Sequence, residues 1–78
     1  MRREDVYAAI DGEREHQDAK YGGIGPTKSR SVPHYLVVLR AELAEAEAAW
    51  LKSGDYAATH ELRQVAAVAV AALEEHGC

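Results

Sequence analysis

Apolar residues recur with helical spacing in three stretches of the chain, which run over about residues 3–19, 31–53 and 55–76. Glycine, proline and polar residues separate the first stretch from the second, so residues 21–32 are expected to form a loop. The pattern therefore predicts an all-α chain of three helices.

The expected helix ends carry residues that start and stop helices. Ser31 can cap the second helix, and Pro33 fits its first turn. Gly54 is expected to end that helix, Asp55 to cap the third helix, and Gly77 to stop it. Because the connection between the second and third helices is so short, we expect them to form an antiparallel hairpin.

The breadth of the apolar surface indicates self-association. On the third helix, the apolar residues of 65–73 cover more than half of the circumference, which is too wide for a three-helix monomer to bury. A homo-oligomer, most simply a two-fold dimer and otherwise a tetramer, would bury them in a four-helix-bundle-like core built by two hairpins. The second helix is expected to contribute a core stripe of Leu36, Leu39, Leu43, Ala46 and Trp50.

Composition and charge narrow the class of protein. The 78 residues are expected to form one domain, 1–78, and the single cysteine excludes an internal disulfide. A net charge of −4 argues against nucleic-acid binding, which needs a clustered basic surface. Because no apolar run approaches the ~20 residues of a membrane helix and no signal-peptide pattern is visible, we expect a cytoplasmic protein without a membrane partner.

Acidic residues on the two hairpin helices form a candidate metal site. Glu42 and Glu45 share one helix face, on a flank of the core stripe. Glu61 falls within the apolar arc of the third helix, and Gln64 borders it. Because Glu45 and Glu61 lie at similar distances from Gly54, an antiparallel hairpin would make them face each other. Carboxylates in such a seam repel one another, and a hard cation such as Mg²⁺ relieves that repulsion.

A second interpretation of these acids stays open. A glutamate pair on an alanine-rich helix is commonly a solvated surface, and the helix dipole favours Glu61 near an N-terminus. Glu61 could also form a salt bridge with Arg14, Arg40 or Arg63. The chain would then be a non-catalytic, helical, homo-oligomeric interaction module that binds no metal.

Three basic residues flank or lie in the glycine-rich loop, and they are candidates for contacting the phosphates of an anionic ligand. These residues are Lys20, Lys28 and Arg30, and the other interpretation is a solvated polar loop. The glycines of the loop are not followed by Gly-Lys-Ser/Thr, so a phosphate-binding P-loop is excluded.

Three segments of the chain are similar to conserved stretches of one protein family. Residues 13–22, EREHQDAKYG, resemble the opening ERxRQDAKWG. Residues 39–45, LRAELAE, resemble L-x-E-E-x-G-E, and residues 61–70, ELRQVAAVAV, resemble E-L-x-D/Q-V-A-A-V-A-V. The family is the MazG-like group of all-α nucleoside triphosphate pyrophosphohydrolases, and the first segment is similar to its small phage and bacterial members. The resemblance covers about residues 13–77.

This resemblance implies a Mg²⁺-dependent enzyme, or one that uses Mn²⁺, which converts a nucleoside triphosphate into the monophosphate and pyrophosphate. The family holds its metal with the motifs E-E-x-x-E and E-x-x-D on successive helices. Glu42 and Glu45 match the second and third acids of the first motif, and Glu61 matches the glutamate of the second. These three glutamates are therefore the expected catalytic residues and metal ligands.

Two positions depart from the family pattern. Ala41 replaces the first glutamate of the first motif, and Gln64 replaces the aspartate of the second. Gln64 still offers a neutral oxygen to a metal, and it is expected to act as an auxiliary ligand. The loss of two acids implies weaker metal binding and weaker activity.

Overall fold

The computed structural model describes residues 1–21 and 29–78, and within these ranges it contains helices and no strands. The helices are α1 (Arg3–Tyr21), α2 (Val32–Ser53) and α3 (Asp55–His76). This confirms the all-α prediction, although α1 continues past its expected end at residue 19. None of the described helices is long and apolar enough to cross a membrane.

The helix ends follow local chemistry, with one correction. The Ser31 hydroxyl caps α2 by accepting a hydrogen bond from the backbone N–H of His34 at 3.2 Å. Gly54 ends α2 with a φ of 88°, a conformation that side-chain-bearing residues rarely adopt. The prediction that Asp55 caps α3 is wrong, because Gly54 takes the cap position. The Asp55 carboxylate instead accepts a hydrogen bond from Trp50 Nε1 at 2.8 Å, across the turn.

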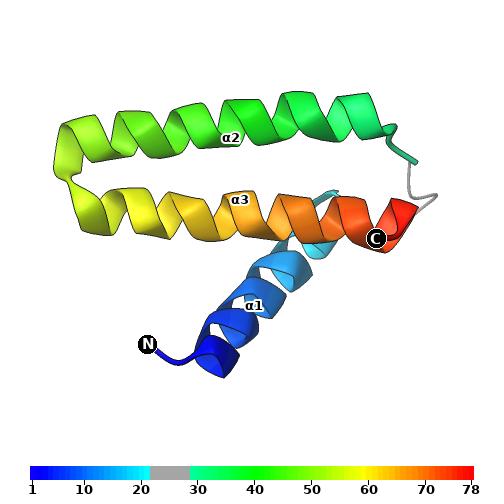
Figure 1. The fold of residues 1–78 in the computed structure, drawn as a ribbon, viewed down its shortest axis with the longest axis horizontal. Coiled ribbons are helices and arrows are strands. Elements are labelled where there is room, and N and C mark those ends of the chain that lie inside the picture. The colour runs from blue at the N-terminus through cyan, green and yellow to red at the C-terminus, as the bar shows by residue number, and fades with distance from the viewer. Residues whose placement is uncertain (22–28) are drawn as a thin grey trace.

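The predicted hairpin is present. Figure 1 shows α2 and α3 side by side and antiparallel, joined by the tight turn at Gly54. The first helix crosses α3 obliquely and packs against it, whereas the described parts of α1 and α2 do not pack on each other. The third helix is therefore the central element of the fold.

The packed interior of the single chain is small. Only Tyr35, Ala46 and Ala67 are buried among the described residues. Two of these are alanines, which allow helix backbones to approach closely but bury little apolar area. The described part of the chain therefore has few buried apolar contacts of its own.

The expected core stripe on α2 is wrong for the single chain. Leu36, Leu43 and Trp50 are 60%, 47% and 53% exposed, and only Ala46 of the stripe is buried. The face of α2 that meets α3 is rotated toward Tyr35 and the half-buried Glu42. A carboxylate that we expected on the flank of the stripe consequently lies in the seam between the two helices.

Candidate metal centre

The carboxylates of Glu42, Glu45 and Glu61 meet across the α2–α3 hairpin. One carboxylate oxygen from each residue lies within 4.8 Å of the others. Glu42 and Glu45 are brought onto one face by the i, i+3 spacing of α2, and Glu61 reaches them because α3 runs antiparallel. The structure therefore brings together the three glutamates that the sequence singled out.

The three acids differ in their access to solvent. Glu42 and Glu61 are half-buried, whereas Glu45 is exposed. The Oε2 atom of Glu42 is buried and has no hydrogen-bond partner. A buried carboxylate oxygen without a partner is costly, and a bound cation would supply what it lacks.

The pKa of Glu42 is raised above its ordinary value. Burial of the carboxylate is the main cause, followed by the negative charge and close contact of Glu45 and then by the charge of Glu61. Ionised Glu42 thus destabilises the metal-free hairpin, because three negative groups converge in a partly desolvated seam. The arrangement favours either a proton or a cation between the carboxylates.

The spacing of the carboxylates fits a small divalent cation. Mg²⁺ binds oxygen at about 2.0–2.1 Å, so two of its ligands lie at most about 4.2 Å apart. Oxygens within 4.8 Å of one another need only small side-chain rotations to reach that geometry. Glu42, Glu45 and Glu61 are therefore a chemically suitable ligand set for Mg²⁺ or Mn²⁺.

A cavity of about 1000 Å³ adjoins this centre, between α1, α2 and α3. Glu42 and Gln64 both line it, so the expected auxiliary ligand borders the same space as Glu42. Lys20 and Arg30 also line the cavity, whereas Lys28 lies outside the described residues. The lining carries basic and acidic side chains together. The basic ones and histidines are Arg14, His16, Lys20, Arg30 and His34, and the acids are Glu13, Asp18, Glu42, Glu74 and Glu75.

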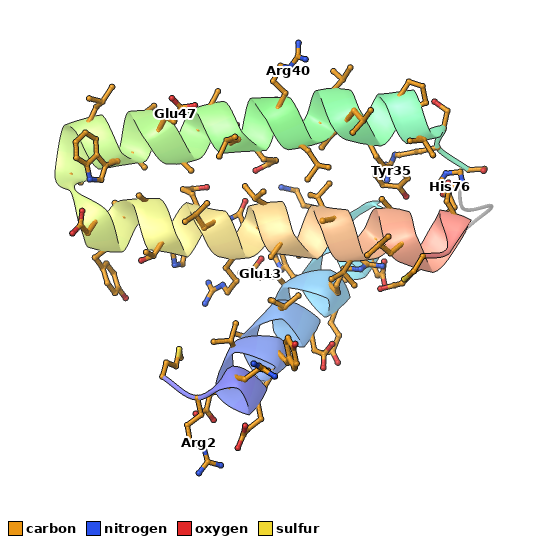
Figure 2. The ribbon with its side chains drawn as sticks, viewed as in Figure 1. Arg2, Glu13, Tyr35, Arg40, Glu47 and His76 are labelled. Atoms are coloured by element: carbon orange, nitrogen blue, oxygen red, sulfur yellow. The ribbon has the colours of Figure 1, made fainter. Side chains whose placement is uncertain are left out.

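A cluster at the end of the hairpin, which the sequence did not reveal, fixes the cavity edge near Arg30. The Glu75 carboxylate accepts hydrogen bonds from the Arg30 backbone N–H, at 3.1 and 2.9 Å, and from the Tyr35 hydroxyl at 3.2 Å. His76 Nε2 lies 2.6 Å from the Arg30 carbonyl oxygen and 3.0 Å from Glu75 Oε2. Figure 2 shows His76 and Tyr35 converging where α3 ends beside the start of α2. No local pattern predicts contacts over 40 residues or more.

The arginines considered as partners for Glu61 either pair with other acids or point away from it. Arg14 pairs with Glu74 at 2.9 Å and with Asp18 at 3.0 Å. Arg63 pairs with Glu13 at 2.9 Å, which ties α3 to α1. The side chain of Arg40 points away from α3 (Figure 2). Within the described residues, no ion pair therefore joins these arginines to the acidic centre.

Comparisons with protein-family models, curated proteins and solved structures find no match for this chain. The MazG-like resemblance accordingly depends on the three sequence segments themselves.

Proposed function

We propose that the chain is a Mg²⁺-dependent nucleoside triphosphate pyrophosphohydrolase of the MazG-like type. The observation that carries this proposal is the meeting of Glu42, Glu45 and Glu61, with oxygens within 4.8 Å and a partnerless buried oxygen on Glu42. Gln64 is the proposed auxiliary ligand. Mg²⁺, or Mn²⁺ in its place, would neutralise the converging carboxylates and polarise phosphate oxygens.

Two basic side chains of the cavity lining are the proposed phosphate contacts. Lys20 and Arg30 place positive charge on the lining that Glu42 and Gln64 also share. Cationic side chains that contact phosphate oxygens would hold the triphosphate in register with the acidic centre. The volume of about 1000 Å³ is at the upper end of the range typical of small-molecule sites, which leaves room for a nucleotide.

The three glutamates would divide two tasks between them. Glu42 and Glu61 are half-buried and are best placed to act as fixed metal ligands. Glu45 is the exposed member, and we assign to it the acceptance of a proton from the attacking water. The water oxygen would bond to the α-phosphorus while the bond to the bridging oxygen breaks and pyrophosphate leaves.

A thermal-unfolding titration with MgCl₂ and MnCl₂ tests the metal centre. A ligand that binds only the folded state raises the unfolding temperature, so the wild-type chain should shift and Glu61→Gln should shift clearly less. Glu15→Gln, which changes an exposed acid on α1, should behave like the wild type. An equal shift in wild type and Glu61→Gln would place the bound metal elsewhere.

A panel of nucleoside triphosphates with pyrophosphate detection then tests the chemistry. Wild-type chain with Mg²⁺ should release pyrophosphate, and Glu45→Gln should release it at least about 100-fold more slowly. A metal-dependent thermal shift without pyrophosphate release from any nucleotide would contradict the enzymatic assignment.

The alternative function is a non-catalytic, homo-oligomeric helical interaction module. Two sequence positions favour it, because Ala41 and Gln64 stand where the family has acids. The many exposed leucines of the hairpin support a homo-oligomer, dimer or tetramer, under either function. Absence of any thermal shift with metal would select this alternative.

A further inference from the structure

One face of the α2–α3 hairpin is apolar and exposed. On α2, the residues at 32, 36, 39, 43, 46 and 50 follow one another at alternating steps of four and three, which is the heptad spacing of helices that pack against partners. Leu36, Leu43 and Trp50 of this row are about half exposed, as are Leu62 and Leu73 on α3. We call these five residues the hairpin face.

The α2 and α3 parts of the hairpin face lie on the same side of the hairpin. Viewed along the axis of α2, Val38, which lines the large cavity, lies on one side of the residues that face α3. Leu36 and Leu43 lie on the other side of those residues. Viewed along the axis of α3, Gln64 and Ala71, which line the cavity, lie on one side of the residues that face α2. Leu62 and Leu73 lie on the other side of those residues. The hairpin face therefore lies opposite the cavity, and both helices contribute to it.

The chain exposes more surface than a typical monomer of its mass. The chain exposes 6044 Å², whereas a monomeric protein of its mass, 8.5 kDa, exposes about 4,700 Å². The excess of roughly 1,300 Å² is larger than the ~800 Å² that each partner buries in a standard interface.

Two exposed charges border the heptad row at equivalent positions. Arg40 and Glu47 are one heptad apart, and each lies one residue after a heptad position. Among the ion pairs of the described residues, none involves Arg40 or Glu47. In two antiparallel copies of α2, with a two-fold axis between residues 43 and 44, each charge would lie opposite its complement.

We infer that the hairpin face binds a second copy of this chain, with α2 antiparallel to the partner's α2. Arg40 then pairs with the partner's Glu47, and Glu47 pairs with the partner's Arg40, so the two-fold axis produces both contacts. The same register places Trp50 beside the partner's Leu36. This inference specifies the face and register of the homo-oligomer in the proposed function and does not depend on the metal centre.

Charge reversal tests the register. Because each interface holds two copies of the pair, Arg40→Glu or Glu47→Arg alone should raise the dimer Kd by about tenfold. The double reversal, Arg40→Glu with Glu47→Arg, should restore the Kd to within about threefold of wild type. Lys52→Glu is the matched control, since it changes the net charge of an exposed site on α2 outside the face.

Sedimentation equilibrium gives the Kd, and the emission of Trp50, the single tryptophan, on dilution gives a second measure. A dimer with twice the 8.5 kDa chain mass and rescue by the double reversal would establish the face and register. A monomer at tens of micromolar would overturn the inference together with the homo-oligomer. If the wild-type chain is a dimer but the double reversal does not restore its Kd, only this face and register would be overturned.

Discussion

Arg14 and Glu74 join the first and last helices by two parallel hydrogen bonds. Arg14 Nε donates to Glu74 Oε1 at 2.9 Å, and Nη2 donates to Oε2 at 3.0 Å. The Arg14 side chain is only 13% exposed and also pairs with Asp18 at 3.0 Å. Since the described part of α1 packs on α3 and not on α2, this fork and the Arg63–Glu13 ion pair together hold α1 on the hairpin.

Replacing Arg14 by lysine should weaken the attachment of α1. Lysine keeps the charge but cannot form two parallel hydrogen bonds with one carboxylate. We expect a loss of about 1 kcal/mol in the free energy of unfolding, measured with urea at fixed protein concentration. Arg3→Lys, at the start of α1, is the control and should leave stability unchanged. Equal stability of the Arg14 variant and wild type would show that the fork is not needed.

The same pair predicts a loss of stability in acid. The hydrogen bonds from Arg14 lower the pKa of Glu74 below its ordinary value of 4.5. The ionised form of Glu74 therefore stabilises the fold above pH 4.5, and this contribution is lost as pH falls through the lowered pKa. Thermal unfolding between pH 3 and pH 5 should show a smaller acid-induced drop in Glu74→Gln. An identical drop in both proteins would contradict the role of Glu74.

Glu42→Gln should stabilise the metal-free protein. The raised pKa of Glu42 means that its ionised form opposes folding, so stability is lost as pH rises from 4.5 through the raised pKa. Glutamine removes one of three converging charges, and we expect a gain of at least about 0.5 kcal/mol at neutral pH. The same variant should lose most of the Mg²⁺-dependent thermal shift. A destabilised metal-free variant would show that Glu42 has an attractive partner.

Enlarging Ala67 should be costly, because its side chain is completely buried where the helices approach. Ala67→Leu adds three carbon atoms where there is no free space. We expect the free energy of unfolding, measured with urea, to fall by about 1–3 kcal/mol. Ala48→Leu makes the same change at an exposed position of α2 and should have little effect. Similar losses in the two variants would mean that the contact at Ala67 can open.

Trp50→Phe should loosen the turn between α2 and α3. Phenylalanine keeps an aromatic ring but cannot donate the 2.8 Å hydrogen bond to Asp55. We expect the free energy of unfolding, measured with urea at fixed protein concentration, to fall by about 0.5–1 kcal/mol. The loss is small because the hydrogen bond is solvent-exposed. A double-mutant cycle with Asp55→Ala isolates the pair. Strictly additive losses would indicate that the two side chains do not interact.

Local chemistry made much of the fold predictable. Periodicity indicated three helices, Ser31 marked the start of α2, and Gly54 and Gly77 marked helix ends. The prediction that Asp55 caps α3 failed because Gly54 already occupies the cap and Trp50 binds the aspartate. Two neighbouring residues compete for one cap, and local sequence alone does not rank them.

The acidic centre was also predictable in outline, because the turn at Gly54 fixes the heights of Glu45 and Glu61 in the hairpin. Its depth was not. Helical spacing placed Glu42 on a flank of the leucine stripe, whereas the structure places it in the seam and exposes Leu43. The small side chain of Ala46 explains this orientation of α2, because it allows α3 to pack closely against the face of α2 that carries Glu42.

The sequence by itself determined the three helices, the hairpin and the meeting of the glutamates, because these follow from backbone hydrogen bonding and helical spacing over short distances. Only the tertiary structure decided which face of α2 is covered, which acids Arg14 and Arg63 bind, and where the apolar surface remains open. These outcomes depend on packing and charge pairing between residues far apart in the chain, and helical periodicity carries no information about them.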